Sequence, residues 1–191
     1  PNFISASLDN CRENTTFEKA AAARDAAIAP GLKELTPEIC GPLATMSPNL
    51  WKAAEELPLS GRALFASLLD WPRHEDPLVS AWLAVNAIRE WRGDTHWAIM
   101  TSENIDGTMA GILDNAKHKY DDQWLPRSRG ADDAAISAAF KKLRERGLAD
   151  GETVTSKGLE YREELERKLN NIASAAWRNL GINQTTQFLE L

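Results

Sequence analysis

The chain has 191 residues, a net charge of −6 and a pI of about 5.2, with 43% hydrophobic and 26% charged residues. This length suits one domain, or one domain with a helical arm, and the composition excludes disordered and fibrous proteins. The negative charge argues against a uniformly basic nucleic-acid binder but leaves room for a local basic face.

Cysteine usage and terminal segments indicate where the protein works. Cys11 and Cys40 lie outside any metal-binding or redox spacing, as expected in a reducing compartment. We find no signal peptide and no long apolar run, so we expect a cytoplasmic protein without a membrane partner. Pro1 does not look like a natural start, and two origins stay open: removal of an initiator methionine, or cleavage of a longer precursor.

Residues 1–60 are predicted to form a helical N-terminal region punctuated by proline. Thr16 is the predicted N-cap of an alanine-rich helix that ends near Ala29, where Pro30 and Gly31 follow. Two later pairs predict further helix starts: Thr36-Pro37 and Ser47-Pro48.

Residues 61–191 are predicted to form a winged-helix domain with long flanking helices. A long helix is expected from about Pro77, because apolar residues recur there at intervals of three and four. Gly93 is predicted to interrupt this helix, and Asp94 to cap a second segment that begins at Thr95.

Capping residues and glycines delimit the next predicted elements. Asp106 caps a helix that runs to about Ala116, and Asp132 or Asp133 opens another that ends at Gly147. A tight hairpin around Asp150-Gly151 and a final long helix capped by Thr155 follow. The predicted fold is therefore mainly α-helical: a winged helix-turn-helix with a short two-stranded wing near residues 148–155, preceded by a helical bundle region.

The segment from Ile136 to Arg162 resembles the winged-helix domains of MarR-type regulators. A helix ends there in Arg146-Gly147-Leu148, and a hairpin leads to a helix start of the form Thr155-x-x-Gly158. The resemblance implies a DNA-binding regulator, dimeric through its terminal helices.

A set of short motifs carries a closer resemblance. Their order along residues 60–180 resembles the SalK-like helix-turn-helix family of actinobacteria, and the first 35 residues resemble an internal segment of that family. This implies a missing N-terminal segment and lends the chain a fold more than a function. The motifs are Gly61-Arg62-Ala63-Leu64-Phe65-Ala66, Trp71-Pro72, Asp76-Pro77, Arg89-Glu90, Arg92-Gly93-Asp94-Thr95-His96 and the winged-helix segment.

The helix that begins near Asp132 is the predicted reader of double-stranded DNA, because this helix enters the major groove in the fold. Between Asp132 and Lys168, however, eight basic residues face nine acidic ones, and the wing carries Asp150 and Glu152 without a basic residue. A helix kept only for folding or dimerisation is the alternative. The predicted DNA-contacting residues are Arg127, Arg129, Ser137, Lys141, Lys142 and Arg144.

A second candidate site lies at the expected helix break. His96 is a candidate acid or base if Asp94 orients it, and Arg92 a candidate partner for an anionic ligand. The alternative is structural: an Arg92–Asp94 pair, a capping Asp94 and a packed His96. The predicted ligand-binding residues are Trp91, Arg92, Asp94, His96 and Trp97, with His96 and Asp94 as catalytic candidates.

Metal and cofactor signals are weak. His74, His96 and His118 lack a ligand spacing, and no phosphate-binding glycine motif occurs, so we expect no metal and no cofactor. Three functions stay open: a DNA-binding regulator that senses a small molecule, a ligand-binding protein or biosynthetic enzyme that has repurposed the winged helix, and a structural partner of a missing N-terminal segment.

Overall fold

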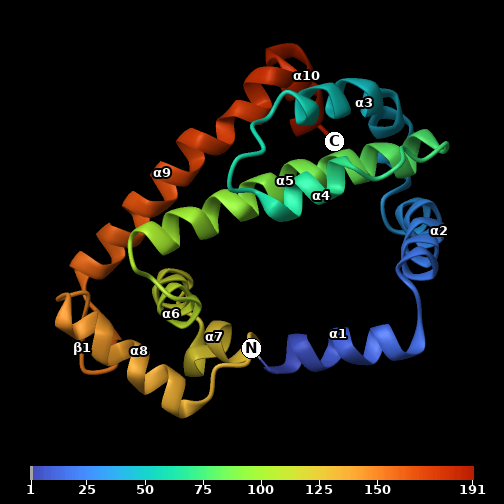
Figure 1. Ribbon diagram of the computed structural model, residues 1–191. Coiled ribbons are helices and arrows are strands. Elements are labelled where there is room, and N and C mark those ends of the chain that lie inside the picture. The colour runs from blue at the N-terminus through green and yellow to red at the C-terminus, as the bar shows by residue number, and fades with distance from the viewer. Residues whose placement is uncertain (1) are drawn as a thin grey trace. The chain divides into compact units, whose positions relative to one another are not determined.

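The computed structural model describes residues 2–191, with side chains from residue 5 on (Figure 1). These residues are mainly helical, as predicted, and the one sheet among them is the two-stranded wing. Pro1, predicted to mark a cleavage or boundary position, lies outside the described residues. The elements are α1 (Asn2–Asn14), α2 (Phe17–Leu35), α3 (Pro37–Glu55), α4 (Ala63–Leu69), α5 (Pro77–Ser102), α6 (Gly107–His118), η1 (Asp121–Gln123), α7 (Trp124–Ser128), α8 (Asp133–Glu145), β1 (Ala149–Asp150), β2 (Thr153–Val154), α9 (Ser156–Leu180) and α10 (Ile182–Leu189).

The chain folds as two compact units, and the division lies within the long helices α5 and α9. The winged-helix unit is His96–Asn171; the helical unit is Asn2–Thr95 together with Ile172–Leu191. Residue 60, the expected boundary between the N-terminal region and the winged-helix domain, lies inside the helical unit. Each unit has its own hydrophobic core.

The core of the helical unit joins α3, α4 and α5 to the end of α9, and α10 packs on α3 (Figure 1). Leu50, Phe65 and Trp91 are completely or almost completely buried in it. The same core contains a small polar network. Ser47 Oγ donates to Ser80 Oγ at 3.0 Å, and the indole N–H of Trp51 donates to the same Ser80 Oγ at 2.9 Å. These bonds satisfy polar atoms whose burial would otherwise destabilise the fold.

Two predicted helix boundaries in the helical unit are wrong. Helix α2 continues through Pro30 to Leu35, and Ser47-Pro48 lies inside α3 rather than at a helix start. Proline in a helix interior costs about 3 kcal/mol. Leu50 and Trp51, just after Pro48, are buried in the core, and their burial offsets that cost in α3. Ala29, beside Pro30, is buried in the same core, although one methyl group contributes only about 0.8 kcal/mol.

The winged-helix unit gathers α6, α7, α8, the wing and the first part of α9 around one core (Figure 1). Phe140 and Leu143 of α8 are completely buried, against Ile112 and Leu113 of α6. Helices α6 and α7 approach closely at Gly111, where an added Cβ would lie 3.2 Å from Pro126 Cβ.

The predicted caps and hairpin of this unit are confirmed. The Asp106 carboxylate accepts hydrogen bonds from the N–H groups of Thr108 and Met109, and Asp132 accepts one from Ala135. In the wing, Ala149 pairs with Val154 and Asp150 with Thr153.

Candidate functional site

A helix-turn-helix precedes the wing. Helix α7 ends at Ser128, and Gly130, at φ +87°, turns the chain toward α8. The N–H groups of Arg129 and Ala131 both donate to Pro126 O, at 3.2 and 3.1 Å. Asp132 then caps α8. Because this turn is hydrogen-bonded at both ends, it holds α8 in a defined direction relative to α7.

Helix α8 has a buried face and a solvent face. The apolar residues Ile136, Ala139, Phe140 and Leu143 point into the core of the winged-helix unit. On the solvent side, Ala134, Ser137, Ala138 and Lys141 are exposed. Small side chains around one serine and one lysine let another surface come close to the helix backbone.

Three of the six predicted DNA contacts already bind protein atoms. Lys142 forms an ion pair with Asp106 at 2.8 Å, and Arg144 donates to Gly151 O in the wing at 2.8 Å. Arg127 pairs with Asp133 at 2.7 Å and also donates to the carbonyl of Asp122. These side chains therefore stabilise the unit, whatever else they contact.

The ion pair between Lys142 and Asp106 also helps to lower the pKa of Asp106. Burial works to raise the pKa of Asp106, but hydrogen bonds from Lys142 and from the backbone N–H groups of Met109 and Thr108 outweigh it, so the pKa is lowered. Asp106 consequently stays charged at neutral pH, where it caps α6 and holds Lys142 of α8.

The other three predicted contacts are exposed, and within residues 5–191 no protein partner is found for the side chains of Arg129, Ser137 and Lys141. Arg129 lies in the turn before α8, and Ser137 and Lys141 lie one helical turn apart on its solvent face. The structure thus places Ser137 and Lys141 on one face of α8 and leaves Arg129 exposed in the turn before it.

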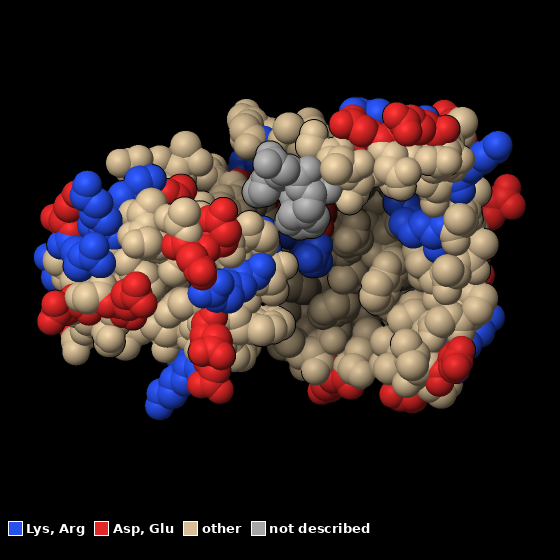
Figure 2. Space-filling view, turned by 90° about the horizontal axis from the view of Figure 1, so that it is seen from below, with Lys and Arg blue, Asp and Glu red and all other residues tan. Residues whose placement is uncertain are grey.

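The wing is acidic at its tip. Asp150, Gly151 and Glu152 are exposed, and Gly151, at φ +55°, makes the turn. Figure 2 shows one face of the molecule, on which lysine and arginine side chains are interspersed with aspartate and glutamate rather than gathered into a patch. The described wing therefore offers no positive charge to a phosphate backbone.

The Thr155-x-x-Gly158 start of α9 holds the base of the wing. Thr155 Oγ1 accepts a hydrogen bond from the N–H of Gly158 at 3.1 Å and donates to Gly147 O at 3.1 Å. A Cβ on Gly158 would lie 2.2 Å from Leu148 O and 2.7 Å from Val154 Cγ1. Only glycine fits where α9 meets Leu148 and Val154.

A hydrogen-bonded network centred on Glu103 joins the end of α5 to α8 and α9. The Glu103 carboxylate accepts hydrogen bonds from Lys168 Nζ at 2.5 Å and from the Tyr161 hydroxyl at 3.0 Å. Arg146 donates to that hydroxyl at 2.9 Å and to Glu103 O at 3.2 Å. The hydrogen bonds from Lys168 and Tyr161 lower the pKa of Glu103, while burial raises the pKa of Tyr161 and keeps its hydroxyl protonated at neutral pH.

Glu103→Gln is expected to lower the melting temperature at pH 7 by a few degrees and to reduce its acid sensitivity. A carboxyl whose pKa is lowered by folding stabilises the fold above its unfolded pKa, and the effect is lost as the pH falls through the folded pKa. The stabilisation is therefore lost progressively as the pH falls below about 5. Melting curves at a series of pH values from neutral to acid check it, with the exposed Glu160→Gln as control. Parallel pH profiles for wild type and Glu103→Gln would contradict the assignment.

The break predicted at Gly93 does not occur, because α5 runs without interruption from Pro77 to Ser102. Asp94 therefore caps no new segment of α5. Its carboxylate accepts a hydrogen bond at 2.9 Å from the N–H of Phe65, the third residue of α4. Arg62, the N-cap residue of α4, makes no side-chain capping bond, so Asp94 performs this role from another helix.

The continuous helix also distributes the predicted ligand-binding residues around its axis. Trp91 is buried, and its indole N–H donates to Pro58 O at 3.0 Å. Asp94 and His96 are two positions apart, and such positions in a helix do not face each other. The physical reason for expecting this pair to act together, a helix break, is therefore removed. His96 contacts the exposed Trp97 edge to face.

Arg92, one of the five predicted ligand-binding residues, lines a pocket of the helical unit. This pocket has a volume of about 250 Å³ and lies in the helical unit, where Ile88, Trp177 and Phe188 also line it. No local sequence pattern connects residue 177 or residue 188 to Arg92, so this pocket could not be predicted from the sequence.

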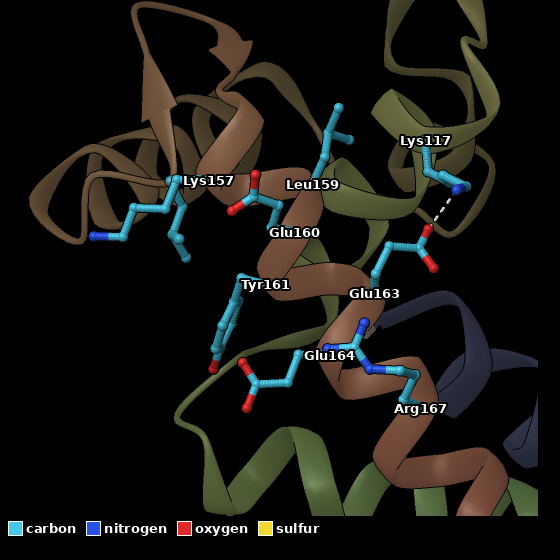
Figure 3. Close-up of a pocket in the computed structure, with 9 residues that line it drawn as sticks. Lys117, Lys157, Leu159, Glu160, Tyr161, Glu163, Glu164 and Arg167 are labelled. Atoms are coloured by element: carbon cyan, nitrogen blue, oxygen red, sulfur yellow. Dashed lines mark ion pairs between the residues drawn. The ribbon is translucent and has the colours of Figure 1, made fainter.

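A larger surface depression lies along the first turns of α9 in the winged-helix unit (Figure 3). Charged side chains of both signs surround it, and Lys117 forms an ion pair with Glu163 across one edge. The Tyr161 hydroxyl is bonded to Glu103 and Arg146. These contacts hold Lys117, Glu163 and Tyr161 in place along the depression.

Among the residues that the structure describes, no group of three His, Cys, Asp or Glu side chains is arranged to hold a metal ion. Within that same part of the chain, no helix combines the length and apolar character needed to cross a bilayer.

Comparison with known proteins agrees with this geometry. No curated protein and no solved structure matches the chain. The model of a helix-turn-helix family, however, matches residues 1–191. A family of this description points to DNA binding and to the regulation of transcription. Because the match covers all 191 residues, the chain belongs to this helix-turn-helix family.

Proposed function

We propose that the chain is a MarR-like regulator of transcription that contacts the DNA major groove with the solvent face of α8. The observation that carries the proposal is the exposed pair Ser137 and Lys141 on one face of α8, with Arg129 exposed in the turn that leads into this helix. Lysine binds guanine edges or phosphates, and serine bonds to several bases. Ala134 and Ala138 let the helix approach the bases, and alanine also contacts the methyl group of thymine.

The acidic start of α8 is less repulsive than its sequence suggests. Asp132 uses its carboxylate to accept the N–H of Ala135, and Asp133 is paired with Arg127. One of the two charges at the helix start is thus neutralised by a neighbouring guanidinium. This arrangement supports the approach of α8 to a phosphate-lined groove.

The wing takes no part in binding under this proposal. Asp150 and Glu152 would be repelled by phosphates, so few cations per protomer contact the DNA backbone. If Arg129 supplies one such contact in each protomer of a dimer, the logarithm of the affinity falls with the logarithm of salt concentration with a slope of about −2. Such a slope is shallow for a specific DNA-binding protein.

We infer that the active form is a homodimer joined through the terminal helices. Ile182 and Leu189 of α10 are each 79% exposed, and Leu35 at the end of α2 is equally unprotected from solvent. Large apolar side chains that are this exposed to solvent favour an interface with a second copy of the chain. A dimer also supplies two α8 helices for the two halves of a palindromic site.

A selection from a random duplex library, followed by fluorescence anisotropy on the enriched sequence, tests the proposal. Lys141→Ala is expected to weaken binding about 10- to 100-fold, because a good base contact contributes about 1–3 kcal/mol of discrimination. Arg129→Ala is expected to weaken all duplexes alike and to make the salt slope shallower by about 1 for each phosphate contact that is lost. The control is Lys52→Ala, which removes the same charge from an exposed position in α3 of the helical unit.

Three outcomes would contradict the proposal. The library yields no enriched sequence, or Lys52→Ala weakens binding as much as Lys141→Ala, or neither Lys141→Ala nor Arg129→Ala changes the affinity. The last two would mean that α8 is not the helix that contacts DNA.

We further propose that the protein senses a small molecule. Arg92 supports it, since this predicted anion-binding residue lines an apolar pocket in the helical unit. No comparable arrangement supports an enzymatic role for Asp94 with His96.

A further inference from the structure

We propose that the helical unit binds a small apolar carboxylate, such as an arylalkanoate, in the pocket between α3, α5, α9 and α10. The inference names the ligand class for the sensing role proposed above, but it stands independently of DNA binding. Six apolar side chains form most of the lining: Leu50, Val85, Ile88, Ala173, Trp177 and Phe188.

The size of the pocket limits the ligand. Its volume is about 250 Å³. Apolar cavities of about 150 Å³ hold one benzene molecule, and pockets for drug-sized ligands begin at about 300 Å³. The pocket therefore fits one aromatic ring, or a comparable branched alkyl group, with a short side chain.

Two arginines select for a negative charge. Arg89 and Arg92 are three positions apart on α5, so they share a face of the helix, and both line the pocket. The side chain of Arg89 is 74% exposed, and Arg92 is exposed as well. An exposed arginine along an apolar wall buries its aliphatic stem and keeps its guanidinium at the rim.

Glu90 is paired with Arg89, so one of the two guanidinium groups along this wall already has an acidic partner. A planar guanidinium binds a carboxylate through two parallel hydrogen bonds, which a neutral ligand of the same shape cannot accept equally well.

Helix α10 covers the pocket with a single aromatic residue. Phe188 packs on Trp177 with ring centroids 5.3 Å apart, whereas none of the residues of α10 is fully buried. The helix follows Gly181, at φ +84°, and its side chains reach α3 and α9 through two bonds, from Asn49 to Gln184 and from Thr185 to Trp177 O. A ligand under Phe188 adds apolar contact to this lightly held helix, so binding should protect the amides of residues 182–189 from hydrogen exchange.

Isothermal titration calorimetry of the full chain with 3-phenylpropionate, without DNA, tests the proposal. We expect saturable one-site binding, and at least tenfold weaker binding of the neutral 3-phenylpropanamide. Arg92→Gln should weaken binding of the acid about tenfold but leave binding of the amide unchanged. Ala173→Leu, which fills the pocket, should abolish binding of both. The control Arg12→Gln removes an exposed arginine that is also paired with a nearby acid, Asp9, and should have no effect.

Stability and hydrogen exchange make these outcomes decisive. Melting curves verify that each variant folds, and exchange is measured with and without the acid. Absence of saturable binding, equal binding of acid and amide, or unchanged binding by a folded Ala173→Leu protein would each overturn the proposal. Protection outside residues 182–189 without protection inside them would place the ligand elsewhere and would overturn it as well. None of these results depends on whether the protein binds DNA.

Discussion

Gly158→Ala is expected to destabilise the winged-helix unit by about 3 kcal/mol, at the upper end of the usual cost of overpacking. The new Cβ would lie 2.2 Å from the carbonyl oxygen of Leu148 and 2.7 Å from Val154 Cγ1. A backbone oxygen cannot rotate away as a flexible side chain would, so either α9 or the wing must shift. The higher helix propensity of alanine returns only about 1 kcal/mol.

Thermal unfolding followed by circular dichroism measures this effect. A loss of about 3 kcal/mol corresponds to a fall in melting temperature on the order of 10–20 °C for a unit of this size. Gly107→Ala is the matched control in the same unit, because its Cβ would meet only Trp97 Cη2, at an ordinary 3.6 Å. A Gly158→Ala protein as stable as Gly107→Ala would show that the wing does not hold its close contact with α9.

Trp91→Ala is expected to destabilise the helical unit by about 3–5 kcal/mol, the usual cost of removing a large buried aromatic side chain. Only 1% of Trp91 is exposed, its N–H is bonded to Pro58 O, and the guanidinium of Arg62 lies 4.6 Å from its ring. Arg62 is held in place by hydrogen bonds to Thr95 Oγ1 and Ser60 O. Removing the indole therefore leaves a cavity and exposes an organised polar layer.

Trp97→Ala provides the comparison. This second indole of the same predicted segment is 48% exposed, and its removal is expected to cost about 1 kcal/mol or less. Urea unfolding of both variants measures the difference. Equal destabilisation by the two substitutions, or a Trp91→Ala protein that keeps its stability, would contradict a structural role for Trp91 and would return this residue to the candidate ligand site.

Local hydrogen bonds explain which predictions from the sequence are confirmed. Asp106, Asp132 and Thr155 each cap a helix through a backbone N–H two or three residues ahead. The hairpin at Asp150-Gly151 depends on a two-residue turn. Such interactions lie within a few residues of the chain, so composition and spacing reveal them.

Non-local contacts explain the errors. Proline within α2 and α3, and glycine within α5, are tolerated because neighbouring residues of those helices are buried against other helices. The hydrogen bond from Phe65 to Asp94 joins residues 29 positions apart, and the pair of Asp106 with Lys142 joins residues 36 positions apart. Helix propensities, which describe single residues, carry no information about such partners.

The candidate sites divide in the same way. The position of α8 between a turn and a wing follows from the sequence, whereas the folded structure decides that Lys142, Arg144 and Arg127 bind protein atoms and that Arg129, Ser137 and Lys141 are exposed. The pocket lined by Arg92, Trp177 and Phe188 could be found only from the folded structure, because its residues come from α5 and from the end of the chain.

The sequence by itself determined the mainly helical class of this protein, the caps of α6, α8 and α9, and the two-stranded wing, since each depends on hydrogen bonds between near neighbours. Only the tertiary structure decided that α5 is continuous, that Asp94 caps α4, and which basic side chains of the helix-turn-helix bind protein atoms. The physical reason is that burial and ion pairing depend on residues far apart in the chain, whose proximity exists only after the helices have packed.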